Sequence, residues 1–185
     1  SRALEGDDAE RWREFAELLT PVTKAWCTDV GMDVTSTAVQ VFGGMGYIEE
    51  SGVSQHFRDA RIAPIYEGTN GIQAMDLVGR KLGQSGGTNT QAFLGDVAKF
   101  VAENSNHPVL GPAVQELGAA QEALAGTVMR LLGWFQMGQM DRVPLAANRF
   151  LEMMAEVAVG WLLLDGARIA LEAQSKLSEG DKDYA

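Results

Sequence analysis

The sequence has little of what disulfide-bonded proteins, metalloproteins and nucleic-acid-binding proteins need. It has one cysteine and two histidines in 185 residues, so no internal disulfide can form and no metal-ligand spacing occurs. The 25 acidic residues outnumber the 15 basic ones, and the resulting net charge of −10 disfavours nucleic acid and anionic membranes as partners. No apolar run approaches the roughly 20 residues of a membrane span. We therefore expect a protein of a reducing, cytoplasmic compartment.

The start of the chain also lacks the features of a targeting segment. Residues 1–8 have neither the basic start nor the apolar run of a signal peptide. They resemble a stretch between helices, and we expect the chain to be a fragment of a longer protein.

Apolar residues make up 46% of the chain, enough for a packed core. Alternating β patterns are absent and apolar residues recur at steps of three and four, which predicts an all-α, up-and-down helical bundle. Thr20 and Pro21 have the order of a helix cap and a first helical residue, so we expect one helix to end there and another to begin. The predicted helices cover 8–19, 20–42, 54–62, 70–82, 91–103, 114–135 and a last one from Pro144 onward.

Glycine is unusually frequent for a helical protein, with 21 residues. One group lies in predicted loops, and the Gly/Ser/Thr-rich segment 84–90 predicts a linker between a domain at 1–83 and a second helical bundle at 91–185. A second group lies inside predicted helices and is expected to mark close helix packing: Gly118, Gly126, Gly133, Gly160 and Gly166.

The segment 40–46, Gln-Val-Phe-Gly-Gly-Met-Gly, has three glycines in four positions. Such spacing lets backbone N–H groups approach an anion without side-chain clash. A glycine-capped helix end followed by a turn explains the same residues, and both interpretations stay open on this segment alone.

The segment 66–71, Tyr-Glu-Gly-Thr-Asn-Gly, puts a carboxylate just before a predicted helix. Glu67 is either an acidic residue favoured by the helix dipole or a base for proton abstraction. In the second case Ile65 and Tyr66 would supply an apolar wall, and Gly68 would admit a substrate.

These two segments, with Phe-Arg-Asp-Ala-Arg at 57–61 between them, occur in one order at close spacing. The pattern resembles the C-terminal helical domain of acyl-CoA dehydrogenases over roughly residues 15–82. The variant Ile-Tyr-Glu-Gly-Thr-Asn-Gly-Ile-Gln is most similar to large bacterial members related to 3-methylmercaptopropionyl-CoA dehydrogenase. Such members carry a helical extension, which residues 88–177 would form.

The resemblance implies an FAD-dependent oxidoreductase that dehydrogenates an acyl-CoA thioester to the trans-2-enoyl-CoA. It implies Glu67 as the catalytic base, whose backbone N–H also binds the thioester carbonyl. Tyr66 and Gly68 take substrate-binding positions. The implied FAD-contacting residues are Gln40, Val41, Phe42, Gly43, Gly44, Thr69, Asn70 and Gly71, the first five reaching the ADP portion of a cofactor held mainly by a neighbouring subunit.

The resemblance further implies a homo-oligomer, dimer or tetramer, with electron-transferring flavoprotein as electron acceptor. Gly71 replaces a glutamine of many family members, so one side-chain contact to FAD is lost there. Because the regions that hold the flavin ring lie outside this sequence, we expect the chain alone to be inactive. The alternative is a non-catalytic helical assembly module, favoured by the long apolar seam at 114–135.

Overall fold

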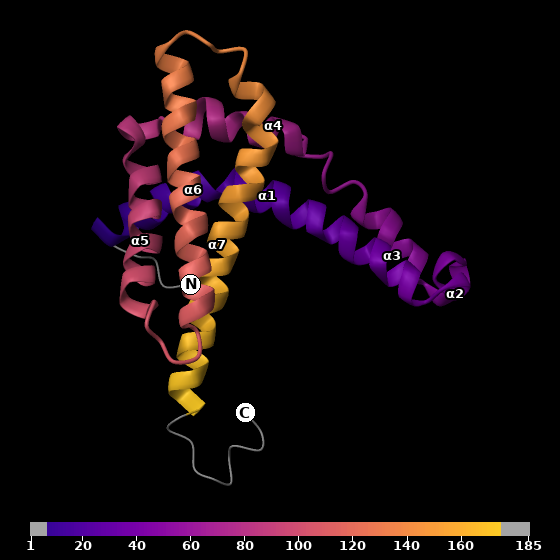
Figure 1. The fold of residues 1–185 in the computed structure, drawn as a ribbon. Coiled ribbons are helices and arrows are strands. Elements are labelled where there is room, and N and C mark those ends of the chain that lie inside the picture. The colour runs from indigo at the N-terminus through magenta and orange to yellow at the C-terminus, as the bar shows by residue number, and fades with distance from the viewer. Residues whose placement is uncertain (1–6, 175–185) are drawn as a thin grey trace.

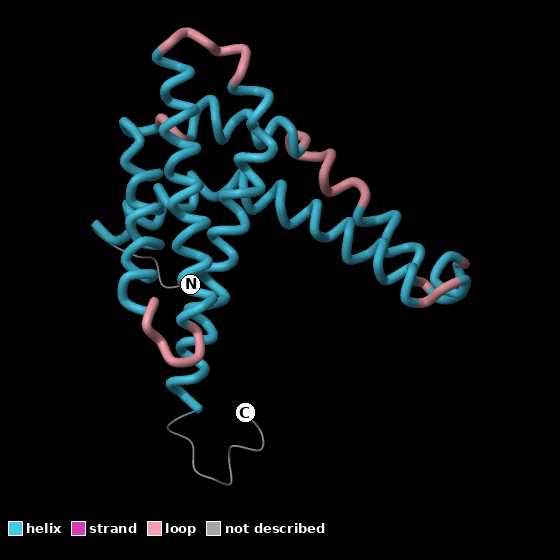
Figure 2. Tube along the Cα trace, in the orientation of Figure 1, coloured by secondary structure: helices cyan, strands magenta, loops and turns pink. Residues whose placement is uncertain are grey.

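The computed structural model describes residues 7–174, and within them every regular element is helical (Figures 1 and 2). The all-α prediction is confirmed. The helices are α1 (Asp7–Val41), α2 (Gly44–Tyr47), α3 (Val53–Ala60), α4 (Asn70–Asp76), α5 (Thr88–Asn104), α6 (Gly111–Gln136) and α7 (Val143–Gln174). Short 3-10 turns cover Glu49–Ser51 and Gln84–Gly87, and a π-helical turn, Leu77–Lys81, continues α4. None of these helices is both long and apolar enough to cross a membrane.

The described chain has two regions, a bundle and an arm (Figure 1). The bundle consists of residues 7–28 and 70–174 and contains the start of α1 together with α4 to α7. The arm, residues 29–63, is the second half of α1 with α2 at its tip and α3 packed back along it. Residues 64–69 form the loop that returns the chain from the arm to the bundle (Figure 2).

The prediction of two helices separated at Thr20 and Pro21 is wrong, because α1 runs without a break through Pro21. Proline removes one helical hydrogen bond and crowds the preceding turn, which costs about 3 kcal/mol in an isolated helix. Here Pro21 is fully buried between Leu18 and Val22, two residues of the hydrophobic core. Burial of this face of α1 offsets the local cost, so tertiary packing overrides the local signal.

The bundle has one hydrophobic core, to which helices from both ends of the chain contribute. The ring of Phe93 on α5 lies 6.0 Å from the ring of Phe15 on α1 and 6.2 Å from that of Trp161 on α7. The apolar seam predicted on α6 faces this core through Val114, Leu117, Leu124, Val128 and Leu131. The segments 1–83 and 91–185 were predicted to belong to two domains. Their buried side chains pack together in this one core.

The segment predicted as a linker is folded. Residues 84–87 form a helical turn and α5 begins at Thr88, with Asn89 and Thr90 buried. Ser85 and Gly86 have positive φ angles, 53° and 68°, which turn the chain sharply between α4 with its π-helical turn and α5. The assignment of separate domains on either side of this turn stays a prediction.

The helical glycines only partly mark close packing. A Cβ on Gly118 would lie 3.0 Å from Val101 on α5, and one on Gly160 would lie 3.6 Å from Leu117 on α6. By contrast, a Cβ on Gly126 or Gly166 would meet nothing within 4 Å. The packing prediction is wrong for Gly126 and Gly166, because residue type alone does not show which side of a helix faces a neighbour.

Candidate functional site

The return loop, residues 64–69, carries the predicted base in an unusual backbone conformation. Glu67 has a φ of 53° and Gly68 a φ of 84°, so two consecutive residues lie in the left-handed region. A non-glycine residue seldom adopts this region, and such residues concentrate at functional sites. The Asn70 backbone N–H donates to the Pro64 carbonyl at 3.1 Å and closes the loop. Thr69 then caps α4, its hydroxyl oxygen accepting from the Ile72 N–H at 3.4 Å.

Side chains from two helices hold this loop. Lys24 of α1 donates from Nζ to the Gly68 carbonyl at 2.8 Å and to Asn70 Oδ1 at 2.8 Å. Gln73 of α4 donates from Nε2 to the Glu67 carbonyl at 3.0 Å. Both carbonyls of the left-handed pair are therefore fixed by side-chain donors, and neither donor is on the loop itself.

Asn70 attaches the end of the loop to α1. Its Nδ2 donates to the Ala25 carbonyl at 3.1 Å, to Thr28 Oγ1 at 2.9 Å and to Asp29 Oδ1 at 2.7 Å. Its Oδ1 also accepts from Lys24. The whole side-chain amide of Asn70 is thus used within the chain, which leaves only the backbone of this residue for an external ligand.

The Glu67 side chain is exposed on the loop surface, and its neighbours Ile65 and Tyr66 are exposed as well. Within residues 7–174, no acceptor takes a hydrogen bond from the Glu67 backbone N–H. The loop therefore exposes a carboxylate next to two exposed apolar side chains, and within the described residues the backbone N–H of Glu67 has no acceptor.

The glycine-rich segment lies at the tip of the arm, where α1 ends and α2 begins. Gly43 has φ 58° and ψ −141°, a combination that side chains other than hydrogen disfavour. Gly46 is buried, and a Cβ there would lie 2.4 Å from the Val39 carbonyl oxygen, so α2 packs on the last turn of α1 only because this residue is glycine. A Cβ on Gly44 would meet nothing within 4 Å. Backbone conformation explains Gly43 and close packing explains Gly46, while Gly44 faces open space.

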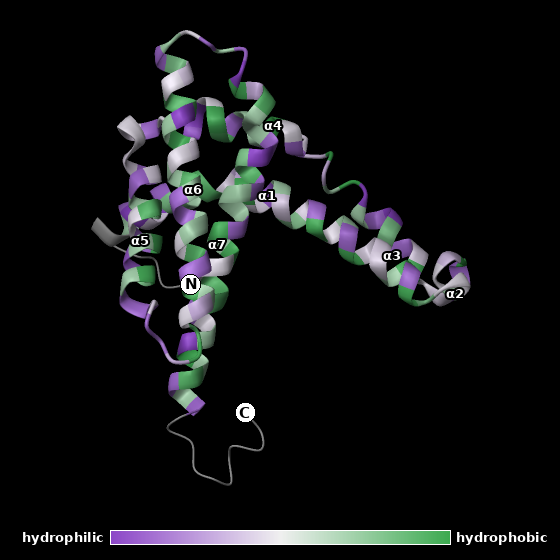
Figure 3. Cartoon of the chain, viewed as in Figure 1, coloured by the Kyte–Doolittle hydropathy of each residue, from purple (hydrophilic) through white to green (hydrophobic). Residues whose placement is uncertain are grey.

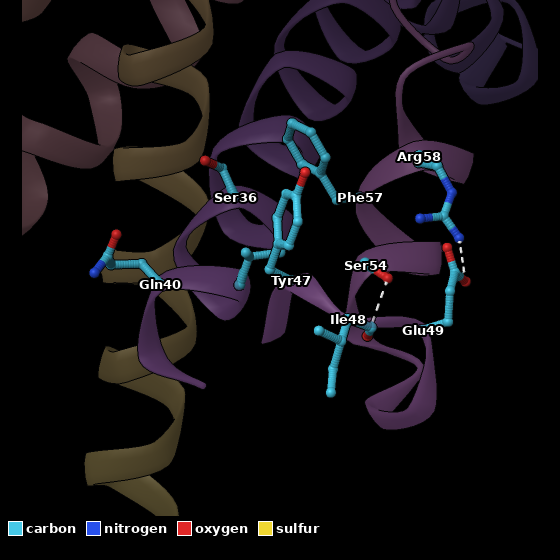
Figure 4. Close-up of a pocket in the computed structure, with 9 residues that line it drawn as sticks. Ser36, Gln40, Tyr47, Ile48, Glu49, Ser54, Phe57 and Arg58 are labelled. Carbon is cyan, nitrogen blue, oxygen red and sulfur yellow. Dashed lines mark hydrogen bonds and ion pairs between the residues drawn. The ribbon is translucent and has the colours of Figure 1, made fainter. Parts of the chain in front are cut away.

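Gln40, Val41 and Phe42, the other predicted cofactor-contacting residues of this segment, are all exposed. Gln40 lines a cavity of about 770 Å³ between the end of α1, the tip and α3 (Figure 4). Arg58 Nη2 donates to Glu49 Oε2 at 2.8 Å in its wall, and Ser54 Oγ donates to the Ile48 carbonyl at 3.4 Å. The complete lining is Ser36, Val39, Gln40, Tyr47, Ile48, Glu49, Ser54, Phe57 and Arg58.

Several lining residues, including Ser36 and Ser54, were not singled out by sequence reasoning. The signal that could have found them is the short spacing between the glycine segment and α3, which forces α3 to pack back on α1. Arg58 lies in the sequence motif, but its pairing with Glu49 across the tip depends on that turn. Among the described residues, no group of three or more His, Cys, Asp or Glu side chains could hold a metal ion.

The predicted site residues form two separate groups. The group around Glu67 is bonded to α1 near Thr28, whereas Gly43 and Gly44 follow the end of the helix at Val41. At a rise of about 1.5 Å per residue, the two groups are roughly 20 Å apart along α1. The structure therefore places residues 66–71 at the base of the arm and residues 40–44 at its tip (Figure 1). Gln40 lines one pocket, and Asn70 and Gly71 line a different one.

Two known families match the chain in succession. Residues 2–82 match the family described as "Acyl-CoA dehydrogenase, C-terminal domain", and residues 93–185 match "Acetyl-CoA dehydrogenase C-terminal like". The boundary between the two matches falls at the folded turn before α5.

Curated relatives match nearly the whole chain. It is 39% identical over 170 residues to 3-methylmercaptopropionyl-CoA dehydrogenase of Ruegeria pomeroyi, covering 91% of this chain and 28% of that protein. It is 28% identical over 187 residues to the broad-specificity linear acyl-CoA dehydrogenase FadE5 of Mycobacterium tuberculosis, covering 98% of this chain and 31% of the relative. A butyryl-CoA dehydrogenase of Syntrophomonas wolfei is 31% identical over 180 residues, covering 95% and 29%. The chain spans less than a third of the length of each.

Proposed function

The chain belongs to the acyl-CoA dehydrogenase family, and from that premise we propose that it carries the catalytic base of an enzyme that oxidises acyl-CoA thioesters. The product would be the trans-2-enoyl-CoA. The observation that carries this proposal is the loop of residues 64–69, which presents a carboxylate in a fixed left-handed conformation beside an unpaired backbone N–H.

In the proposed reaction, the Glu67 carboxylate removes the proton from the α-carbon of the thioester. The electrons of that C–H bond form the new α,β double bond as the β-hydrogen leaves with its electron pair. FAD, when bound, supplies the hydride acceptor for that step. The Glu67 N–H donates to the thioester carbonyl, which stabilises the charge that develops on its oxygen and makes the α-proton more acidic.

The residues proposed to contact FAD fit such a role to different degrees. Gly44 has open space where a side chain would stand, and Gln40 is exposed beside it, so both can meet a ligand that approaches the tip. The Thr69 hydroxyl accepts one hydrogen bond and keeps its hydrogen for donation, and Gly71 is exposed. The Asn70 side chain is saturated by α1, so any contact from Asn70 would use its backbone.

The distance between the two groups of residues supports contacts to two different cofactor molecules. Since the tip lies roughly 20 Å from the Glu67 loop along α1, a homo-oligomer in which the tip reaches the ADP portion of a neighbour's FAD accounts for both groups. Such an assembly would also cover the exposed apolar residues of the arm. We extend the proposal to a dimer or tetramer, with acyl-CoA as substrate and electron-transferring flavoprotein as the electron acceptor.

A helical assembly module is the second candidate, and the exposed apolar surface of the arm favours it. Light scattering and calorimetry on the 185-residue chain separate the two roles. A defined oligomer that binds neither FAD nor acyl-CoA would support assembly as the role of this part, whereas a monomer would count against it.

The test of the proposed base is the variant Glu67→Gln in the complete gene product. The variant should retain its bound flavin, but acyl-CoA should no longer bleach the flavin absorbance, because the neutral amide cannot accept the α-proton. Glu116→Gln on the exposed face of α6 is the matched control and should bleach normally. Undiminished bleaching by Glu67→Gln would reject the assignment. Butyryl-CoA, longer acyl-CoAs and 3-methylmercaptopropionyl-CoA would be titrated in turn to define the acyl group.

A further inference from the structure

Lys24 makes contacts that a surface lysine does not ordinarily make. It lies on α1, 44 positions before Gly68, and its ammonium is shared between the Gly68 carbonyl and Asn70 Oδ1, both at 2.8 Å. No carboxylate among the described residues lies within ion-pair distance of it; the nearby Asp29 binds Asn70 instead. A charged donor is therefore used to hold a neutral backbone carbonyl, and that carbonyl belongs to the residue after the proposed base.

The helix that carries Lys24 is packed into the bundle on both sides of this residue. Val22 and Ala25, on either side of it, are both buried in the core of the bundle. Because α1 is fixed at this point, the ammonium is held in place and can in turn fix the loop. The second carbonyl of the left-handed pair, that of Glu67, is fixed by Gln73 from α4.

The conformation that these donors hold is one that glutamate does not prefer. With φ at 53° for Glu67 and 84° for Gly68, the two successive peptides are turned so that the Glu67 carbonyl accepts from Gln73 and the Gly68 carbonyl accepts from Lys24. Relaxation of Glu67 to an ordinary conformation would rotate these peptides, move the carboxylate and redirect its N–H. Groups of this kind, which hold a reacting side chain through hydrogen bonds, set the precision of a site.

We propose that Lys24 is a positioning residue for the left-handed pair Glu67 and Gly68, which it holds through the Gly68 carbonyl in the conformation that aims the Glu67 carboxylate and its N–H at an acyl-CoA thioester. The proposal rests on the proposed function of Glu67. Lys24 does not lie within ion-pair distance of the Glu67 carboxylate, so it acts through the loop and takes no proton.

The test compares flavin reduction in single turnovers of the complete, FAD-loaded gene product. Lys24→Met keeps the length of the side chain and removes its donors, and Lys99→Met on an exposed part of α5 is the matched control. The reduction rate per bound flavin should fall about 30-fold in Lys24→Met, since a small misplacement of a reacting group costs up to about 100-fold. The dissociation constant of a non-oxidisable acyl-CoA analogue should change less than about threefold, and Lys99→Met should match the unmodified protein.

If Lys24→Met does not fold, a second variant, Lys24→Arg, still tests the proposal. Lys24→Arg retains a charged donor with a different reach. This variant should bind flavin fully, but its flavin should be reduced about three- to tenfold more slowly than that of the unmodified protein. In addition, deuterium at the substrate α-carbon should slow Lys24→Met or Lys24→Arg more than the unmodified protein, because proton removal becomes the slow step. A purely structural role would lower the flavin content without changing this isotope effect.

An unchanged reduction rate per bound flavin in both Lys24 variants would overturn the proposal. Glu67→Gln in the same assay distinguishes failure of the positioning role of Lys24 from failure of the assignment of Glu67 as the base. If Glu67→Gln is inactive while the Lys24 variants are unimpaired, only the positioning role is rejected. If Glu67→Gln reduces its flavin at the full rate, the assignment of the base is rejected and the role of Lys24 with it.

Discussion

Apolar residues occur along both the arm and the bundle (Figure 3). The two regions bury them to very different extents. In the bundle, Phe93 and Val97 are completely buried, and the core is shared by α1, α4, α5, α6 and α7. On the arm, only Gly46 and Ser54 among residues 29–63 are buried. The large apolar residues of the arm that are more than half exposed are Val34, Val41, Phe42, Met45, Tyr47 and Ile62.

This difference in burial separates the region that stabilises the chain, the bundle, from the region whose apolar surface is free to contact other molecules, the arm. Burial of apolar surface contributes about 25 cal/mol per Å², so the bundle accounts for most of the stability that the chain supplies for itself. The arm is held by the packing of α3 and α2 on α1 and by polar contacts such as the Arg58–Glu49 pair at its tip. Its remaining apolar surface is left for other contacts, as the proposed cofactor and subunit contacts require.

The largest expected effect comes from removing a large side chain in the bundle. Phe93→Ala should lower the free energy of unfolding by about 3–5 kcal/mol, because it leaves a cavity between Phe15 and Trp161. Urea denaturation of the 185-residue chain measures this change. Phe42→Ala on the exposed tip should change the same free energy by less than about 0.5 kcal/mol. Equal losses in the two variants would mean that the arm has a packed core of its own.

A smaller effect is expected at the tip, where two glycines differ in their surroundings. Gly46→Ala should cost about 1–3 kcal/mol locally, since its Cβ would collide with the Val39 carbonyl, whereas Gly44→Ala should leave the tip folded. Hydrogen exchange should show faster exchange of the amides of residues 42–47 in Gly46→Ala, with α6 unchanged. Equal protection in both variants would show that α2 does not pack on α1 as described.

The smallest effect distinguishes two glycines of α6 in the bundle. Gly126→Ala should raise the free energy of unfolding by about 0.5–1 kcal/mol, because alanine favours a helix and the added methyl group meets open space. Gly118→Ala should be neutral or destabilising, since its Cβ would press on Val101 at 3.0 Å. Thermal unfolding of the two variants side by side measures the difference. A gain of the same size in both would show that α5 and α6 are not in close contact at Gly118.

Much of the fold was predictable because the relevant signals are local. The steps of three and four on α6 identified the residues that face the core. The prediction at Pro21 was wrong because its local signal competes with burial, and burial depends on helices far along the chain. Gly126 and Gly166, which are exposed, could not be told from Gly118 for the same reason.

The candidate site was predictable in part. The order of the glycine-rich segment and the Glu67 loop indicated the family, which the comparisons then showed. Lys24 was missed, because a single lysine on a helix ordinarily faces solvent and nothing in its neighbourhood points to residue 68. The cavity beside Gln40 was also missed, since it exists only because α3 packs back along α1.

The sequence by itself determined the helical class, the residues of the core-facing seam on α6 and the family to which the chain belongs, because periodicity and motif order are read within short stretches. Only the tertiary structure decided that α1 continues through Pro21, that both halves of the chain share one core and that Lys24 holds the Gly68 carbonyl. Each of these depends on residues that are distant in sequence and adjacent in space. The free energy of such contacts is absent from any local pattern, and it outweighs the local preferences where the two disagree.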